Sequence, residues 1–278
     1  MTRRLRISAI SYLNTAPLLW NFEHATAGSQ FDVAYTIPSG CAAALAEGTA
    51  DIGIIPAAAY SSIPGLVILP DIAIAARRTV RSILLVSKVP LEQVRSVALD
   101  TSSLTSVALT KVIFKKWMGG GRTFTSMPPD LDLMLAKHDA GLVIGDPALQ
   151  VDRRRYLTFD LAEEWVRLTG KPCVFAFWAV RETALVDAGG LDLTRIFQRS
   201  RDNGLTPEHV DLIARSWGPR LQMSGDDVKS YLTENIEYHL DSETLDGLVL
   251  FYKYCLECGA LPSAPPVRFH EQPRLVNR

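Results

Sequence analysis

The chain has 278 residues, of which 47% are hydrophobic and 21% charged, so it carries enough apolar side chains for a folded core. Its net charge of −1 excludes the basic excess typical of proteins that bind nucleic acids or membrane surfaces. No run approaches the ~20 apolar residues of a membrane span. The basic start is not followed by a long apolar segment, so we expect no signal peptide and a cytoplasmic location.

Strand-like and helix-like segments alternate along the chain, which predicts an α/β architecture. Apolar runs of strand length predict strands at 6–10, 32–36, 51–55, 66–74, 82–87, 94–99, 140–144, 156–160 and 174–180. Helical spacing of apolar residues predicts helices at 14–20, 41–47, 107–117, 129–137, 145–150, 161–168, 224–240 and 242–258. Ser39 is expected to be the N-cap of the second of these helices, and the tail after Pro262 is expected to be irregular.

The order of the elements predicts two lobes joined by two crossings. With crossings at 87–90 and 179–181, lobe I comprises residues 1–88 plus 180–278, and lobe II comprises residues 89–179. Two connections between α/β lobes permit hinge closure around a ligand. We therefore expect the ligand cleft between the lobes.

The most informative motif is Asp-Thr-Ser-Ser-Leu-Thr-Ser at 100–106, between a predicted strand and a predicted helix. The first N–H groups of a helix lack internal partners and lie at the positive end of its dipole. Hydroxyl groups beside such N–H groups suit a small carboxylate or phosphate. Ser and Thr are also ordinary N-caps, so a well-capped helix is the alternative. Because five of six residues carry hydroxyls, we favour an anion site.

The chain has four cysteines, and Cys255 and Cys258 form a C-x-x-C pair. That pair lies late in a predicted helix, and the sequence contains no second Cys or His pair at metal-binding spacing. We therefore interpret both as thiols of the core and expect neither a metal nor a cofactor.

Seven sequence blocks, in order, resemble the MqnA/MqnD menaquinone biosynthesis family. The first is Ser-Tyr-Leu-Asn-Thr-Ala-Pro-Leu at 11–18, which is similar to the S-Y-L-N-x-x-P-L start of the family. The others lie at 38–42, 48–56, 82–90, 100–106, 144–146 and 169–178. The resemblance implies a two-lobe, type II periplasmic-binding-protein-like fold.

The family has two branches, and the blocks resemble one of them more closely. The cyclase branch, MqnD, carries His-Glu where this chain has Gly145 and Asp146. The chorismate dehydratase branch, MqnA, typically has Gly-Asp there and an asparagine in the first loop, which is Asn14 here. The chain departs from the family at Ala57 and Ala59, where members often carry Ser and Glu.

The resemblance implies that the substrate is chorismate, a dianion, which loses water to give 3-[(1-carboxyvinyl)oxy]benzoate in the futalosine route, without a cofactor. It implies catalytic roles for Asn14, which would donate to an oxyanion or hydroxyl, and for Ser82 near the substrate. The family is proposed to use the enolpyruvyl carboxylate of the substrate as the base. Asp146 is the alternative base, or else the N-cap of the helix at 147.

The remaining expected site residues bind the substrate. Ser103, Thr105 and Ser106 are expected to bind one carboxylate at the helix start, and Ser39 to orient the other end of the substrate. Phe175 and Trp178 are candidates to line the pocket, although aromatic residues in a strand are more often core.

Two other functions remain open. One is the sister cyclase reaction, against which the missing His-Glu pair argues. The other is a solute-binding protein that captures a small anion without chemistry, because a fold does not determine a function. The oligomeric state is not predicted.

Overall fold

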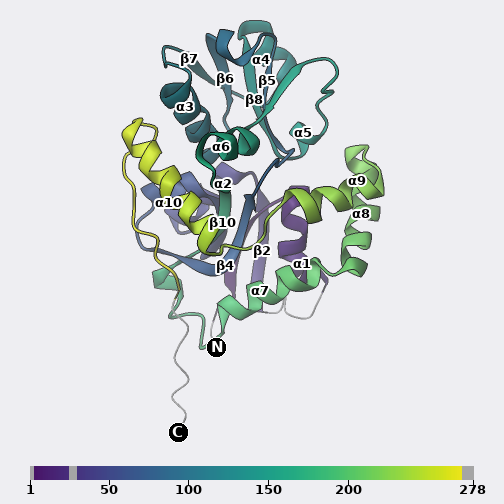
Figure 1. The fold of residues 1–278 in the computed structure, drawn as a ribbon. Helices are drawn as coiled ribbons and strands as arrows, with labels where there is room; N and C mark the ends of the chain where they lie inside the picture. The colour runs from purple at the N-terminus through teal and green to yellow at the C-terminus, as the bar shows by residue number, and fades with distance from the viewer. Residues whose placement is uncertain (1–2, 25–29, 271–278) are drawn as a thin grey trace.

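The computed structural model describes residues 3–24 and 30–270, which form two α/β lobes (Figure 1). The sheet of lobe I has the order β2-β1-β3-β10-β4, and that of lobe II the order β7-β6-β8-β5-β9. The first sheet contains β1 (Leu5–Ile10), β2 (Phe31–Thr36), β3 (Ile52–Pro56), β4 (Leu66–Ala76) and β10 (Cys173–Arg181). The second contains β5 (Ile83–Ser87), β6 (Ser96–Asp100), β7 (Thr123–Met127), β8 (Ala140–Ile144) and β9 (Leu157–Asp160). The predicted α/β two-lobe fold is confirmed.

Helices cover both sheets (Figure 1). Those of lobe I are η1 (Leu13–Thr15), α1 (Ala16–His24), α2 (Pro38–Glu47), η3 (Ala57–Ser62), η5 (Glu182–Ala184), α7 (Leu193–Gly204), α8 (Pro207–Leu221), α9 (Gly225–Ser230), η6 (Tyr231–Asn235) and α10 (Ser242–Glu257). Those of lobe II are η4 (Leu91–Gln93), α3 (Thr105–Trp117), α4 (Leu131–Lys137), α5 (Gly145–Leu149) and α6 (Leu161–Thr169). Helix α10 packs against both β10 and α3, so it contacts both lobes.

The central strands are apolar along their whole length because both faces of each sheet are covered. All five residues of β3, β5 and β8 are buried. One cluster of buried apolar side chains runs through both lobes. The lobes are therefore joined by packing as well as by the two chain connections.

The chain changes sheets at 77–82 and 170–172, earlier than predicted at both places. Strand β5 pairs antiparallel with β8 and β9, so it belongs to lobe II. Strand β10 pairs with β3 and β4, so it belongs to lobe I. The predicted boundaries after residues 88 and 179 placed these two strands in the wrong lobe, because local patterns do not encode long-range strand pairing.

The predicted helix 224–240 is wrong beyond Asn235, and it is a regular α-helix only as far as Ser230. Helix α9 ends there, a π-helical turn follows at η6, and the chain then becomes extended. Glu237 exchanges backbone hydrogen bonds of 2.8 and 2.9 Å with Ala75 on β4. The free edge of β4 thus gains backbone partners from this segment, which outweighs local helical periodicity.

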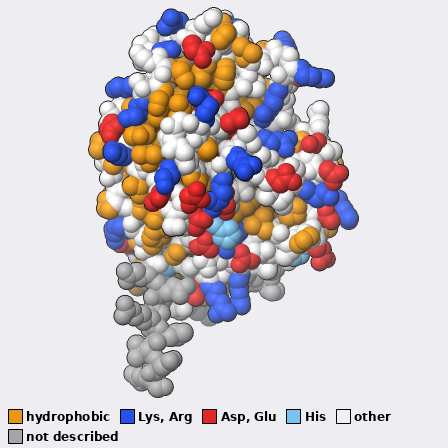
Figure 2. All heavy atoms as spheres, viewed as in Figure 1, with side chains coloured by type: hydrophobic (Ala, Val, Ile, Leu, Met, Phe, Trp, Pro, Cys, Tyr) orange, Lys and Arg blue, Asp and Glu red, His pale blue; other side chains and the backbone are white. Residues whose placement is uncertain are grey.

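The outer surface carries mixed charge. Figure 2 shows Lys and Arg side chains interspersed with Asp and Glu on the face in view. No helix in residues 3–24 and 30–270 combines the length and apolar character that a bilayer span requires. The last eight residues of the predicted irregular tail lie outside the described residues.

We expect Gly204→Ala to destabilise lobe I. Helices α1 and α7 approach so closely that a methyl group at Gly204 would lie 2.2 Å from the carbonyl oxygen of Pro17. The backbone would have to shift, so the free energy of unfolding in urea should fall by about 1–3 kcal/mol. Gly225→Ala is the matched control, since no atom lies within 4 Å of its added methyl group. Equal effects of the two substitutions would contradict this packing argument.

Candidate functional site

A cavity lies between the lobes, as the sequence predicts. Six of the nine predicted site residues line it, and all of its lining residues are neutral. They are Ile10, Tyr12, Asn14, Pro38, Pro56, Ile74, Ser82, Ile83, Ser103, Thr105, Ser106, Ile144, Gly145, Phe175 and Ala176. They come from both sheets and from the starts of α2 and α3, so the closed cavity requires both lobes.

The start of α3 presents hydroxyl and N–H groups to the cavity. Ser103 and Ser106 line it and are both buried. The Ser103 Oγ accepts a 3.3 Å hydrogen bond from the Ser106 N–H, while the residue before the helix, Leu104, provides no side-chain cap. Ser103 thus caps one N–H group of the first turn, as the alternative of a capped helix predicts, and the anion site at 100–106 stays a prediction.

Asp100 holds this loop in place from the end of β6. Its Oδ1 accepts hydrogen bonds from the Ser102 N–H at 2.8 Å and the Ser102 hydroxyl at 2.6 Å. Its Oδ2 is buried without a partner among the described residues. Burial raises the pKa of Asp100, although the Ser102 hydrogen bonds oppose that rise. Asp100 belongs to the motif at 100–106, but the motif alone does not indicate this role.

Thr105 links the lobes rather than facing a ligand with a free hydroxyl. Its Oγ1 donates to the Phe175 carbonyl oxygen at 2.9 Å and accepts from the Ala58 N–H at 3.1 Å. All three bonding groups are buried. The hydroxyl is thus already used in both directions, which does not support the predicted carboxylate contact by Thr105.

Ser39 also joins the lobes, through its backbone. Its N–H donates to the Ser102 carbonyl oxygen at 3.0 Å. The predicted N-cap role of Ser39 is wrong, because α2 begins one residue earlier at Pro38 and its N-cap is Ile37. Proline suits the first helical position, since its missing N–H would have no helical partner there. Pro38, not Ser39, lines the cavity.

Asn14 lies in η1 and presents an unsatisfied acceptor. Its Oδ1 is buried and has no hydrogen-bond partner among the described residues. Its backbone carbonyl oxygen accepts a 3.0 Å hydrogen bond from the Tyr238 hydroxyl. A buried acceptor without a partner is costly, so a ligand hydroxyl in the cavity would satisfy it.

Ser82 lies just before β5, where the chain enters lobe II. Its Oγ accepts a 2.8 Å hydrogen bond from the Tyr231 hydroxyl. Its carbonyl oxygen accepts from the Gly145 N–H at 2.7 Å. Burial and the charge of Asp146 raise the pKa of Tyr231, whereas interactions with Ser82, Asn14 and Arg81 lower it. These groups therefore share one electrostatic environment.

Asp146 is held against the other lobe. Its Oδ1 accepts a 2.9 Å hydrogen bond from the Leu13 N–H, and the N-cap of α5 is Ile144. The predicted N-cap role of Asp146 is therefore wrong. Burial raises the pKa of Asp146 to about 6, while the Leu13 N–H opposes that rise. Asp146 is absent from the cavity lining; it fixes the loop that carries Asn14.

Gly145 permits the close contact beside Asp146. Its φ of +65° is a conformation that favours glycine. A methyl group there would also lie 2.5 Å from the Tyr12 ring. The Gly-Asp pair thus supplies both a close ring contact and a hydrogen bond between α5 and η1.

The two predicted aromatic residues have different surroundings. Phe175 lines the cavity and is buried. Trp178 is fully buried in lobe I, where its ring lies 4.8 Å from that of Phe197 on α7. Its predicted pocket role is not supported by this placement, and the alternative core interpretation fits. Side-chain alternation along β10 and an irregular register separate the two residues.

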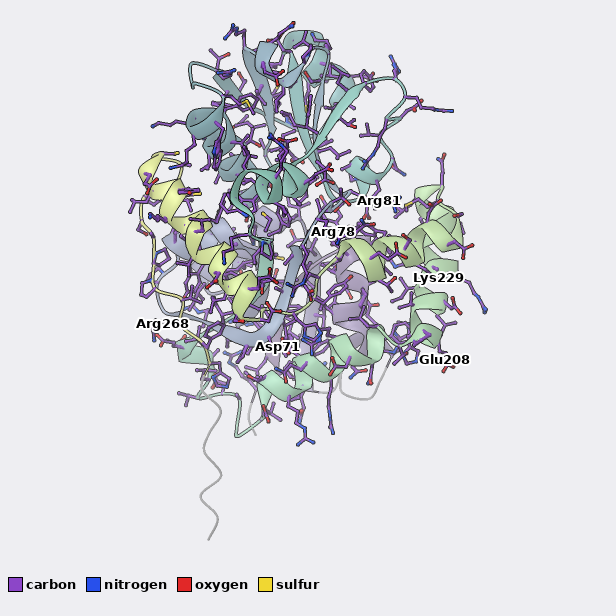
Figure 3. The ribbon with its side chains drawn as sticks, in the orientation of Figure 1. Asp71, Arg78, Arg81, Glu208, Lys229 and Arg268 are labelled. Carbon is purple, nitrogen blue, oxygen red and sulfur yellow. The ribbon has the colours of Figure 1, made fainter. Side chains whose placement is uncertain are left out.

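The positive charge near the site comes from outside the lining. Arg78 and Arg81 lie on the connection 77–82, at the level where the lobes meet (Figure 3). Among residues 3–24 and 30–270, no group of three or more His, Cys, Asp or Glu side chains could hold a metal ion. Any anion in the cavity would therefore be held mainly by hydroxyl and N–H groups.

Known proteins resemble this chain over a range that contains all seven of the family-like sequence blocks. The profile of a family described as menaquinone biosynthesis matches residues 5–257. The chain belongs to the menaquinone biosynthesis family. A curated relative, the chorismate dehydratase of Thermus thermophilus, is 29% identical over 272 residues. The alignment covers 91% of this chain and 94% of the relative.

Solved structures resemble this family member in fold alone. A protein from Archaeoglobus fulgidus has a TM-score of 0.70 at 14% identity, covering 93% of this chain and 98% of the other. The periplasmic aliphatic sulphonate binding protein SsuA of Escherichia coli has a TM-score of 0.66 at 14% identity, covering 100% and 95%. A Candida albicans protein with the generic periplasmic binding protein fold has a TM-score of 0.65 at 12% identity, covering 98% and 99%.

Sequence reasoning missed three tyrosines of the site. Tyr12 stands inside the first family block, so its position was available as a signal. Tyr231 and Tyr238 lie within the segment predicted as one helix, and the sequence contains no motif that pairs them with Ser82 or Asn14. Tyr238 lies in the extended segment after η6, which the sequence predicts as helix.

We expect Thr105→Val in this menaquinone-family chain to lower stability. Valine keeps the shape but leaves the buried Ala58 N–H and Phe175 carbonyl unpaired. The free energy of unfolding should fall by about 2 kcal/mol or more. Thr110→Val is the control, since the Thr110 hydroxyl bonds the Ser106 carbonyl within the same helix. A weaker ligand affinity with unchanged stability would instead support a direct ligand contact.

We expect Asp146→Asn to change the pH dependence of stability. The pKa of Asp146 is about 6 in the folded state and about 3.8 in the unfolded chain. The stability that protonated Asp146 contributes is therefore fully present below about pH 3.8 and is lost as the pH rises through 6. Asparagine does not titrate. In urea unfolding, the stability of the variant relative to wild type should therefore rise by about 2–3 kcal/mol from about pH 4 to about pH 7.5. A stability difference that is the same at both pH values would contradict the raised pKa.

Proposed function

We propose that this protein is an enzyme, a chorismate dehydratase that converts chorismate to 3-[(1-carboxyvinyl)oxy]benzoate and water in the futalosine route. The observation that carries the proposal is the cavity between the lobes, where Asn14, Ser82 and the start of α3 meet. Family membership and the name of the Thermus relative support the same assignment. The proposed cytoplasmic location follows from this biosynthetic role.

The reaction is an elimination that produces an aromatic ring. The carbon that bears the enolpyruvyl ether loses its proton, and the electrons of that C–H bond form the new ring double bond. The hydroxyl on the adjacent carbon leaves with its bonding electrons and takes up a proton to become water. The enzyme has to hold a dianion in one orientation and assist the leaving hydroxyl.

We assign the binding of one carboxylate to the start of α3. Ser103, Ser106 and the first N–H groups of the helix supply neutral donors at the positive end of the dipole. Ser39, which lies in the first turn of the facing helix, is proposed to orient the other end of the substrate through α2. Phe175 provides an apolar wall for the ring. Neutral donors suit a site that must release an anionic product as well as bind an anionic substrate.

We assign the leaving hydroxyl to Ser82 and Asn14. Ser82 donates a hydrogen bond to the departing oxygen, and the unpartnered Asn14 Oδ1 accepts from the same hydroxyl group before it leaves. These contacts fix the adjacent C–O bond for elimination. Preorganised hydrogen-bonding groups such as these stabilise a transition state most strongly when water is excluded from the cavity.

The enolpyruvyl carboxylate of the substrate is the proposed base. Asp146 is turned toward the Leu13 N–H and is absent from the cavity lining, which argues against direct proton removal by its carboxylate. Its proposed contribution is to hold the loop before Asn14. The alternative, with Asp146 as base, requires the Leu13 bond to break.

The cavity has a volume of about 50 Å³. One water molecule takes about 30 Å³ of liquid, so a ring with two carboxylates requires the lobes to separate. Bending at 77–82 and 170–172 would open it, because these are the two places where the chain crosses between sheets. Such hinge closure is a common way to exclude water from a reaction.

Anion capture without chemistry is the second candidate function. The fold similarity to the sulphonate-binding protein of E. coli favours it as the competing hypothesis. The cyclase reaction has less support, since Gly145 and Asp146 stand where that branch carries His-Glu.

Incubation of the purified protein with chorismate tests the proposal directly. Liquid chromatography with mass detection should show many turnovers to a product one water lighter that retains the enolpyruvyl ether. Binding of chorismate by calorimetry without turnover would sink the dehydratase assignment and favour the anion-binding function.

Alanine variants then test the assigned residues. Ser82→Ala and Asn14→Ala should each lower kcat by about 10²–10³-fold, the typical cost of one preorganised polar contact. Ser87→Ala is the matched control on the adjoining strand, since the Ser87 hydroxyl bonds the Val89 carbonyl oxygen at 2.7 Å and does not line the cavity. If all three variants behave alike, Ser82 and Asn14 do not have the assigned roles.

A further inference from the structure

Tyr231 is buried beside the cavity and touches one of the proposed catalytic groups. It is 1% exposed, and its hydroxyl lies 2.8 Å from the Ser82 Oγ. It begins the π-helical turn η6 that follows α9. Such turns occur frequently at functional sites. Tyr231 comes from lobe I, whereas Ser82 directly precedes the first strand of lobe II, so this bond lies at the crossing itself.

The direction of this hydrogen bond determines what Ser82 can do. Each hydroxyl has one hydrogen to donate and can accept as well. The phenol of Tyr231 is the more acidic of the two hydroxyls, so it is the donor and the Ser82 Oγ is the acceptor. The hydrogen of Ser82 is then free to point elsewhere.

Ser82 has only one other hydrogen-bond acceptor in the described part of the chain, and it is poorly placed. The Val80 carbonyl oxygen lies 3.4 Å from the Ser82 Oγ and already accepts the Ser82 N–H at 2.8 Å. A bond of 3.4 Å between oxygen atoms is weak. The Gly145 N–H fixes the Ser82 carbonyl at 2.7 Å, so the backbone cannot turn to improve it. A substrate hydroxyl in the cavity is therefore the better partner.

We propose that Tyr231 is a positioning residue, which donates to Ser82 and so directs the Ser82 hydroxyl hydrogen into the cavity toward the leaving hydroxyl of the substrate. This inference rests on the dehydration proposed above. Tyr231 itself does not line the cavity, so it acts through Ser82. Donation by the phenol also polarises Ser82, which strengthens its own donated bond.

The chain that follows Tyr231 turns along lobe I and reaches Asn14, the second residue assigned to the leaving hydroxyl. The following segment is held on the edge of β4 by Glu237, and the Tyr238 hydroxyl bonds the Asn14 carbonyl oxygen. One stretch of chain thus supports both residues assigned to the leaving hydroxyl. Of the two tyrosines, only Tyr231 is proposed as a positioning residue. Its hydroxyl bonds the Ser82 side chain, whereas the Tyr238 hydroxyl bonds the backbone of Asn14.

A double-mutant cycle of Ser82→Ala and Tyr231→Phe tests the proposal. Tyr231→Phe removes one oxygen and should lower kcat for chorismate dehydration about tenfold, the rate equivalent of one lost hydrogen bond, with KM changed less than about twofold. In the Ser82→Ala background the same substitution should change kcat by less than about twofold. Additive effects would overturn the proposal, because they would show that Tyr231 acts independently of Ser82.

Tyr252→Phe is the matched control. Tyr252 is 2% exposed, and its hydroxyl bonds the Ala57 carbonyl oxygen at 2.8 Å rather than a side chain of the site. Its variant should lose stability in thermal unfolding but keep kcat. A drop in kcat as large as that of Tyr231→Phe would assign the effect to general destabilisation and overturn the proposal.

A second variant covers the case in which Tyr231→Phe does not fold. Replacement of Tyr231 by 3-fluorotyrosine keeps the hydroxyl but lowers its pKa, which makes it a stronger donor. We expect kcat to increase in this variant. The same replacement at Tyr252 should leave kcat unchanged. An unchanged kcat for the Tyr231 variant would overturn the proposal. Absence of turnover by the wild-type protein would overturn both the proposed function and this inference, whereas turnover with an additive cycle would overturn this inference alone.

Discussion

Polar groups buried where the two lobes meet must find partners in the opposite lobe, and the rest of the site depends on this constraint. The Thr105 hydroxyl, the Ser39 N–H and the Asp146 carboxylate each bond across that boundary. An unpaired buried polar group costs about 1–3 kcal/mol. These bonds therefore fix one relative position of the lobes and hold the cavity residues from both sheets in register.

The same constraint separates residues that support the site from residues left for a ligand. Thr105 and Asp146 have partners, so they stabilise the closed arrangement. Asn14 Oδ1 lacks one among the described residues, and the Ser82 hydroxyl has only the long 3.4 Å contact with the Val80 carbonyl oxygen as an outlet for its hydrogen there. The unsatisfied groups of the cavity thus lie where the proposed leaving hydroxyl would be held. A buried polar atom without a partner is uncommon in a folded protein, and a bound ligand is one way to satisfy it.

The C-terminal part of the chain supplies the tyrosines through which lobe I contacts Ser82 and Asn14. The edge of β4 gains backbone partners from the segment around Glu237, which follows the π-helical turn η6. Tyr231 reaches Ser82 from the start of that turn, and Tyr238 reaches Asn14 from the extended segment after it. Helix α10 then crosses from β10 to α3 and packs on both lobes. The segment after residue 230 is therefore part of the site, although it lies far from Asn14 and Ser82 in sequence.

The α/β alternation, the family resemblance and the location of the helix start at 100–106 are readable in the amino-acid sequence, because they follow from local periodicity and ordered motifs. It also placed Asn14, Ser82, Ser103, Ser106 and Phe175 in one set, and the structure brings these five to one cavity. The folded arrangement was needed to show which lobe β5 and β10 join, that Trp178 belongs to the core, and that Tyr231 contacts Ser82. The physical reason is that strand pairing and buried hydrogen bonds join residues far apart in the chain, 149 positions in the case of Tyr231 and Ser82, which no local pattern records.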